Sequence, residues 1–264
     1  MKRWIVKLAM ATLGTMVRAE TPPPPVDFSD LGGIHSAYSD SVVQLVQKEL
    51  KAEAKSGASP IDLRCWTTPG RDLYIGLEQR MHIQAPLKTV AGILDDFSLY
   101  KDLFPGFSEI HLLSREGKKS FSYWEQPIPL PFVPNVKYEM IYLTEDVGEE
   151  GRLYRYQLRK SNTLTASDGF IWIAADKNGG TRFVEYDFFD AKWGAAKVFG
   201  PRKLWLDAIE GMAQSDVAIK LKAENADWPL KKAREQSRKA IAAKILADCY
   251  ESRKPFELES AKQK

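Results

Sequence analysis

The sequence predicts an α+β protein in which a run of antiparallel strands is followed by one long helix. Between residues 107 and 193, short stretches of alternating apolar and polar residues are separated by turns that contain glycine. Consecutive short strands joined in this way are typical of an antiparallel meander. From Pro201 to Ala223 the apolar residues recur instead at helical spacing. With 44% hydrophobic and 28% charged residues, the composition is that of a globular protein.

One strand and two short helices are expected before the meander. Leu73–Ile83 has the alternation of a first strand, weakened at Gly76. Leu87–Asp95 predicts a helix, which Pro86 can open because a missing backbone donor costs nothing there. A second short helix is expected over Leu99–Phe104, before Pro105-Gly106.

The meander itself is expected to hold five or six strands. Arg115–Lys118, Gly148–Gly151 and Asn178-Gly179-Gly180 are turn signals, and the last of them favours a hairpin. The strands between these turns are Phe107–Ser114, Ser120–Gln126, Val136–Glu145, Arg152–Lys160, Gly169–Ala175 and Arg182–Ala191.

Two helices are expected after the meander. The first covers Pro201–Ala223, and Trp228-Pro229 ends the domain. Leu230–Tyr250 predicts a second, more basic helix, followed by a polar tail. The basic stretch Lys231–Lys244 allows a transient contact with anionic lipid, although Glu235 interrupts it and a solvated helix face is the simpler interpretation.

The N-terminal region has the features of an export signal. Lys2 and Arg3 precede the largely apolar stretch Leu8–Val17, with small or β-branched residues around a cleavage point before Glu20. We therefore expect an exported, periplasmic protein, with an amphipathic N-terminal helix as the alternative. The expected organisation is a signal peptide (1–19), a proline-rich linker and solvated helix Ser36–Lys55 (20–72), the main domain (73–226), and a C-terminal helical extension and tail (227–264).

Charge and motifs exclude several function classes. The 38 basic residues nearly balance the 35 acidic ones, so a nucleic-acid partner is not expected. His35, His82 and His111 lack metal-ligand spacing, and no nucleotide-binding or nucleophile motif is present. We expect no cofactor, no metal and no catalytic residue. Cys65 and Cys249 either form one disulfide or are two separate buried thiols.

An apolar segment with four prolines joins two aromatic strands within Phe121–Tyr142. Proline cannot lie inside a central sheet strand, yet Ile128, Leu130, Phe132 and Val133 are apolar for a connection. The segment fits either the mouth of a lipophilic pocket or a covered loop packed on the core.

The faces of the strands leave two registers open. In one, the aromatic residues of the strands point inward, and Arg155, Arg159, Glu185 and Asp187 form solvated cross-strand pairs. In the other, a buried arginine and glutamate orient a polar ligand head, and each needs a partner because an unpaired buried charge is very costly. The first register is the simpler interpretation.

The stretch Gln84–Gly117 (QAPLKTVAGILDDFSLYKDLFPGFSEIHLLSREG) resembles the opening of the START-like helix-grip superfamily, also called SRPBCC. The resemblance rests on the helix after Ala85-Pro86, on Asp96-Phe97, and on Tyr100, Phe104 and the strand that follows. This superfamily includes lipid-transfer START domains and the polyketide cyclase/dehydrase group. The resemblance covers about residues 73–226 and implies a curved sheet that grips the C-terminal helix, with a cavity for a hydrophobic ligand between them.

Three functions follow from these observations. The first is binding or transport of a hydrophobic, lipid-like small molecule without catalysis. The second is a cyclase-type enzyme in which a pocket Arg, Glu or Tyr transfers protons. The third is a protein-interaction module, and the oligomeric state stays open. The residues expected to line the ligand site are Trp124, Phe132, Tyr138, Met140, Tyr142, Tyr156, Trp172, Tyr186, Trp205, Ile209 and Met212.

Overall fold

The computed structural model describes residues 61–68, 71–104, 106–128, 134–146, 151–191, 200–241 and 243–255. The expected signal peptide, linker and Ser36–Lys55 helix lie outside the described residues, as do Phe132 and the centre of the proline segment. No helix in the described part of the chain is long and apolar enough to cross a membrane.

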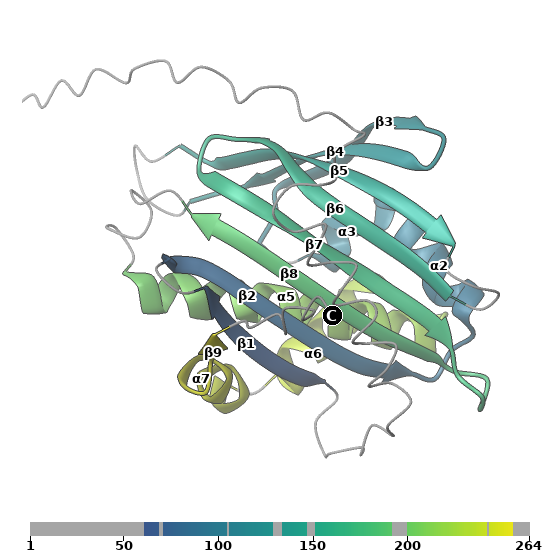
Figure 1. The fold of residues 1–264 in the computed structure, drawn as a ribbon. Coiled ribbons are helices and arrows are strands. Elements are labelled where there is room, and N and C mark those ends of the chain that lie inside the picture. Colours follow the sequence, from purple (N-terminus) through teal and green to yellow (C-terminus); the bar gives the residue numbers. More distant parts are fainter. Residues whose placement is uncertain are drawn as a thin grey trace, which may run out of the picture.

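A nine-stranded sheet forms one layer of the molecule (Figure 1). Its order is β3-β4-β5-β6-β7-β8-β2-β1-β9, and neighbours are antiparallel except for the short pair β1 and β9. The predicted meander is therefore confirmed, and the first predicted strand pairs with its last strand. The strands are β1 (Asp62–Thr68), β2 (Arg71–Ile83), β3 (Glu109–Glu116), β4 (Lys119–Gln126), β5 (Val136–Asp146), β6 (Gly151–Ser161), β7 (Leu164–Ala175), β8 (Thr181–Ala191) and β9 (Lys254–Pro255).

Two strands differ from the sequence prediction. β1 was not predicted, and it extends the sheet beyond the expected start of the domain at residue 73. β7 begins at Leu164, whereas the prediction placed its start at Gly169. A glycine inside a strand was mistaken for a boundary, although here it provides space for a side chain of the neighbouring strand.

The helices α2, α3, α5 and α6 lie on one side of the sheet, which we call the inner face (Figure 1). α5 packs on β2 and also contacts α2, α3, α6 and α7. This arrangement confirms the predicted α+β helix-grip architecture. The helical elements are α2 (Leu87–Asp95), η1 (Phe97–Leu99), α3 (Tyr100–Leu103), α5 (Pro201–Glu224), α6 (Leu230–Ala240) and α7 (Ala243–Glu251).

The prediction of a single helix over Leu230–Tyr250 is wrong, because the helix is interrupted between α6 and α7. Ile241 is extended, with φ −92° and ψ 98°, and its side chain is buried. The break allows Ile241 to join the core and lets α7 pack against β1 and α5.

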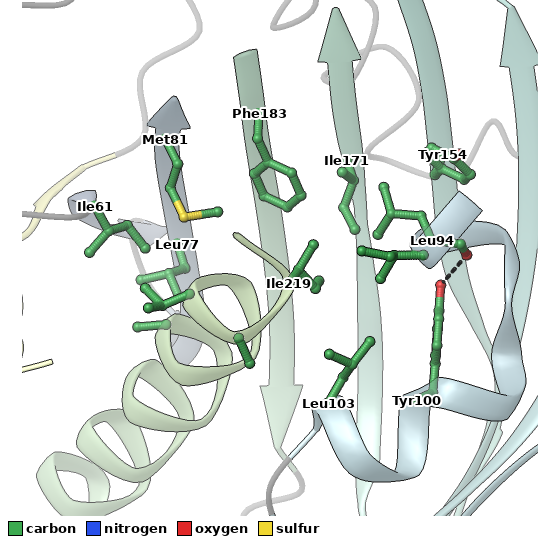
Figure 2. Close-up of a cluster of buried hydrophobic side chains, with 14 of the residues drawn as sticks. Ile61, Leu77, Met81, Leu94, Tyr100, Leu103, Tyr154, Ile171, Phe183 and Ile219 are labelled. Atoms are coloured by element: carbon green, nitrogen blue, oxygen red, sulfur yellow. Dashed lines mark hydrogen bonds between the residues drawn. The ribbon is translucent and has the colours of Figure 1, made fainter. Parts of the chain in front are cut away.

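Hydrophobic side chains gather on both faces of the sheet. On the inner face, strand residues such as Leu77, Phe183 and Ile171 meet Ile219 of α5 and Leu103 of α3 (Figure 2). A smaller outer cluster lies on the opposite face and consists of Leu153, Phe170, Trp172, Ala174, Val184, Tyr186 and Phe188. The strands between these clusters are thus buried on both sides, which affects how their sequences can be interpreted.

A disulfide joins Cys65 of β1 to Cys249 of α7, which decides between the two possibilities that the sequence left open. The two cysteines are 184 residues apart in sequence. A cross-link that closes so long a loop limits the freedom of the unfolded chain.

We expect loss of this disulfide to lower the free energy of unfolding by about 2–4 kcal/mol. Urea unfolding of the wild type and of the double variant Cys65→Ala, Cys249→Ala, each with and without a reductant, measures the effect. The reductant should destabilise the wild type and leave the double variant unchanged. Equal unfolding midpoints for the oxidised wild type and the double variant would contradict the expected contribution.

Candidate ligand-binding site

Four aromatic side chains lie on the inner face of the sheet as two contacting pairs. They are Trp124 of β4, Tyr138 and Tyr142 of β5, and Tyr156 of β6, and we call them the aromatic wall. Trp124 and Tyr138 are stacked, with ring centroids 5.9 Å apart, and the Tyr142 and Tyr156 rings are 5.8 Å apart. The inward register predicted for β5 and β6 is therefore confirmed.

Strand β8 has the opposite register to the simpler interpretation of its sequence. Glu185 lies opposite Ile171 and Gln79, and Asp187 lies opposite Gly169 and Leu77, so both carboxyls point to the inner face. The expectation that Glu185 and Asp187 are solvated is wrong, because both are buried. Alternating aromatic and acidic residues cannot identify the covered face of a strand that is buried on both sides.

The predicted pair of inward-facing charges is also only partly present. Arg155 lies on the outer face, where its Nε is 3.0 Å from Oε2 of Glu145. Arg159 pairs with Glu139 on that same face at 3.0 Å. The inner face therefore carries the buried glutamate without the arginine.

A buried carboxyl cluster consists of Glu185 and Asp187 of β8 with Asp216 of α5. These side chains are 8%, 9% and 1% exposed, respectively. The Asp216 carboxyl interacts electrostatically with Glu185. The Tyr156 hydroxyl donates to Oε1 of Glu185 at 3.0 Å, and Nε2 of Gln79 donates to Oε2 at 3.2 Å. The cluster thus connects α5, β2, β6 and β8, and Tyr156 joins it to the aromatic wall.

Burial raises the pKa of each carboxyl in this cluster. Desolvation is the largest cause for Glu185, Asp187 and Asp216, and the charge of Glu185 raises the pKa of the two aspartates further. The cluster therefore favours protonated carboxyls more than a solvent-exposed site does.

Three oxygens around the cluster lack a hydrogen-bond partner among the described residues. They are Oε1 of Gln79, Oδ1 of Asp187 and Oδ2 of Asp216. Gln79 is fully buried, at 0% exposure. No described lysine or arginine forms an ion pair with the three carboxyls. The amide oxygen of Gln79 can only accept a hydrogen bond, and a buried acceptor without a donor costs roughly 1–3 kcal/mol, so the cluster favours a bound group that donates hydrogen bonds.

The structure places most, but not all, of the predicted lining residues in the inner core. Met140 lies on the inner face with the aromatic wall, and Trp205, Ile209 and Met212 lie on α5 in the same core. Trp172 and Tyr186 belong to the outer cluster, so they cannot share a site with the wall. Phe132 lies outside the described residues.

Sequence reasoning missed Asp216 and Gln79. Asp216 follows Ile209 and Ala213 at helical spacing, so an acidic residue within the apolar stripe of α5 was the available signal. Gln79 had no comparable signal, because a single amide within the alternating strand β2 is equally typical of a solvent-facing position.

A pocket of about 210 Å³ opens at the end of the aromatic wall, beside α2 and the turn that joins β3 to β4. We call it the end pocket. Its apolar side is formed by Leu94, Phe97, Tyr100, Tyr142 and Tyr154. Figure 2 shows Leu94, Tyr100 and Tyr154 close to one another. The Tyr100 hydroxyl donates a hydrogen bond to the carbonyl oxygen of Leu94 at 2.6 Å. Tyr142 belongs to both the end pocket and the wall.

Comparison with solved structures gives the same fold. Human STARD10 matches with a TM-score of 0.50 and 13% identity, over 81% of this chain and 91% of that chain. A STAR-related lipid transfer protein from Xanthomonas axonopodis matches with a TM-score of 0.44 and 19% identity, over 59% and 94% of the two chains. The Zhui aromatase/cyclase from a Streptomyces species matches with a TM-score of 0.40 and 13% identity, over 67% and 94%.

The chain therefore has a START-like helix-grip fold. No protein-family model and no curated protein matches the sequence. Identities this low define the fold alone, so the function has to be argued from the site.

Proposed function

We propose that the protein binds an apolar small molecule that carries a hydrogen-bond donor, between the aromatic wall and α5. The observation that supports this proposal is the set of unpartnered oxygens of Gln79, Asp187 and Asp216 within an otherwise apolar interior. Burying the apolar part of such a ligand provides most of the binding free energy, and the donor satisfies acceptors that are otherwise unpaired. The START-like fold is compatible with a ligand in this position.

The ligand itself is sought by native mass spectrometry of protein purified from its own host, followed by solvent extraction. A bound apolar molecule with an amine, amide or hydroxyl group is the expected result. A protein that is free of ligand and ignores a panel of apolar compounds contradicts the proposal.

The role of the carboxyl cluster is tested with 1-aminoanthracene and anthracene, which differ by one donor group. We expect the wild type to bind the amine about tenfold more tightly, which corresponds to about 1.4 kcal/mol. Asp187→Leu should remove this preference. Asp190→Leu is the matched control, because Asp190 lies on the same strand but on the outer face. Equal fluorescence-derived affinities of the wild type for the two probes would contradict the role of the cluster.

A second candidate function is acid–base catalysis of the cyclase type, and the buried Glu185 carboxyl that accepts a hydrogen bond from Tyr156 favours it. A carboxyl with a raised pKa can act as a general acid, and Tyr156 lies within hydrogen-bond distance of Glu185. If this function holds, Glu185→Gln should abolish turnover of a polyketide-like substrate while binding persists. Turnover unchanged by Glu185→Gln would exclude it.

We also propose that the protein works in an oxidising compartment outside the cytoplasm. The disulfide between Cys65 and Cys249 supports this location, since stable structural disulfides are rare in reducing compartments. Fractionation of the host followed by immunoblotting tests it, and recovery of the protein in the cytoplasm alone would contradict it.

A further inference from the structure

We infer that the end pocket binds the anionic head, a carboxylate or phosphate, of a ligand whose apolar part lies along the aromatic wall. This inference rests on the proposed function and adds a second recognition point to it. The carboxyl cluster would recognise a hydrogen-bond donor on the buried part of the ligand. The end pocket would recognise a negative charge at the other end of the ligand.

The charge balance of the end pocket supports an anion. Three cations line it, together with the carboxylates Asp95 and Asp146. Both carboxylates are engaged by one cation, because Arg152 contacts Asp95 at 2.5 Å and Asp146 at 3.3 Å. The other two cations, Arg115 and Lys118, have no carboxylate partner among the described residues. The pocket therefore has a positive charge in excess of its own acids.

Arg115 is held in place by neutral groups, which leaves its charge uncompensated. Its Nη2 donates to the carbonyl oxygen of Asp95 at 3.1 Å, and its Nε donates to the Ser120 hydroxyl at 3.2 Å. Asp95 is the last residue of α2, where a backbone carbonyl has no partner within the helix. The same residue therefore positions both guanidinium groups, Arg115 through its backbone and Arg152 through its side chain. Prearranged donors of this kind reduce the ordering cost of binding a carboxylate or phosphate.

The apolar side of the pocket leads from the charged mouth to the aromatic wall. The Phe97 and Tyr142 rings are 5.3 Å apart, and the Tyr142 ring also contacts the Tyr156 ring. The Tyr156 hydroxyl in turn donates a hydrogen bond to Glu185. A volume of about 210 Å³ exceeds the roughly 150 Å³ of a cavity that holds benzene, but it is below the roughly 300 Å³ of a drug-sized site. The end pocket thus suits a head group and its first few carbons, with the remaining ligand on the wall.

Calorimetry with decyl phosphate, decanol and inorganic phosphate tests the inference, with each amphiphile kept below its micelle concentration. We expect the wild type to bind decyl phosphate at least tenfold more tightly than decanol, and added salt to reduce this difference. The double variant Arg115→Gln, Lys118→Gln should lose about tenfold in affinity for decyl phosphate and keep its affinity for decanol. Lys160→Gln is the control, because it removes an exposed cation near the opposite end of β6, on the outer face.

Each outcome separates the two proposals. If decanol and decyl phosphate bind equally, or the double variant keeps its preference for the phosphate, the end pocket does not recognise an anion, while apolar binding stands. If inorganic phosphate binds as tightly as decyl phosphate, the pocket is a site for a free anion, and the inference of an amphiphile head is overturned. If neither amphiphile binds, the inference is overturned, and the proposed function is judged separately by the preference for 1-aminoanthracene over anthracene.

Discussion

The free energy of unfolding should fall by about 4 kcal/mol as the pH rises from 5 to 8, on account of one buried carboxyl. Burial raises the pKa of Asp168 from 3.8 to about 8. The folded state therefore holds a proton that the unfolded chain releases near pH 4. The stability contributed by this proton is full below that pH and is lost as the pH rises through 8. The raised pKa values of Glu185, Asp187 and Asp216 act in the same direction.

Asp168→Asn isolates the effect, because an amide does not titrate. Urea unfolding at pH 5, 6.5 and 8 should show the variant gaining several kcal/mol over the wild type at pH 8 and little at pH 5. Asp227→Asn is the control, since Asp227 is exposed, and it should leave the pH dependence unchanged. The lowered pKa values of Glu125 and Asp176 do not interfere, as both groups are already ionised above pH 5. A wild type that is as stable at pH 8 as at pH 5 would show that Asp168 is not buried as described.

The sequence predicted those parts of the fold in which one face of an element is clearly apolar. The alternation of Tyr138, Met140 and Tyr142 with Lys137 and Glu139 gave the correct inward face of β5, although Ile141 on the other face is also apolar. The same reasoning failed on β8, where Tyr186 packs on the outer face while Glu185 points inward. On a strand buried on both sides, hydrophobicity no longer distinguishes the faces, so the orientation depends on partners that only the tertiary structure reveals.

The candidate site was predicted in its aromatic part and missed in its polar part. Trp124 and Tyr156 stood out as large residues on alternating strands, whereas Asp216 and Gln79 are single polar residues on different elements. Their significance comes from meeting Glu185 in space, which no local pattern encodes. The disulfide was undecidable from sequence for the same reason, because its cysteines are 184 residues apart.

Replacing Gly169 with alanine should cost about 4 kcal/mol or more, or prevent folding altogether. A Cβ atom at this position would lie 2.1 Å from the carbonyl oxygen of Tyr186 and 2.7 Å from the hydroxyl of Tyr156. The Tyr186 carbonyl belongs to the paired strand β8, so it cannot move away without disturbing that pairing. Tyr156 is also fixed, because its hydroxyl donates to Glu185. Gly169 is thus required for the space that it leaves rather than for an unusual backbone angle.

Gly211→Ala provides the matched control, since a Cβ at that position in α5 meets no heavy atom within 4 Å. Alanine favours a helix over glycine by about 1 kcal/mol, so this variant should be slightly more stable than the wild type. Urea unfolding of the two variants therefore gives changes of opposite sign. For a folded Gly169→Ala protein, the displaced Tyr156 should also weaken the preference for 1-aminoanthracene over anthracene. If Gly169→Ala were as stable as the wild type, Tyr156 would not lie over Gly169. The hydrogen bond from Tyr156 to Glu185, which joins the aromatic wall to the carboxyl cluster, would then lose its structural basis.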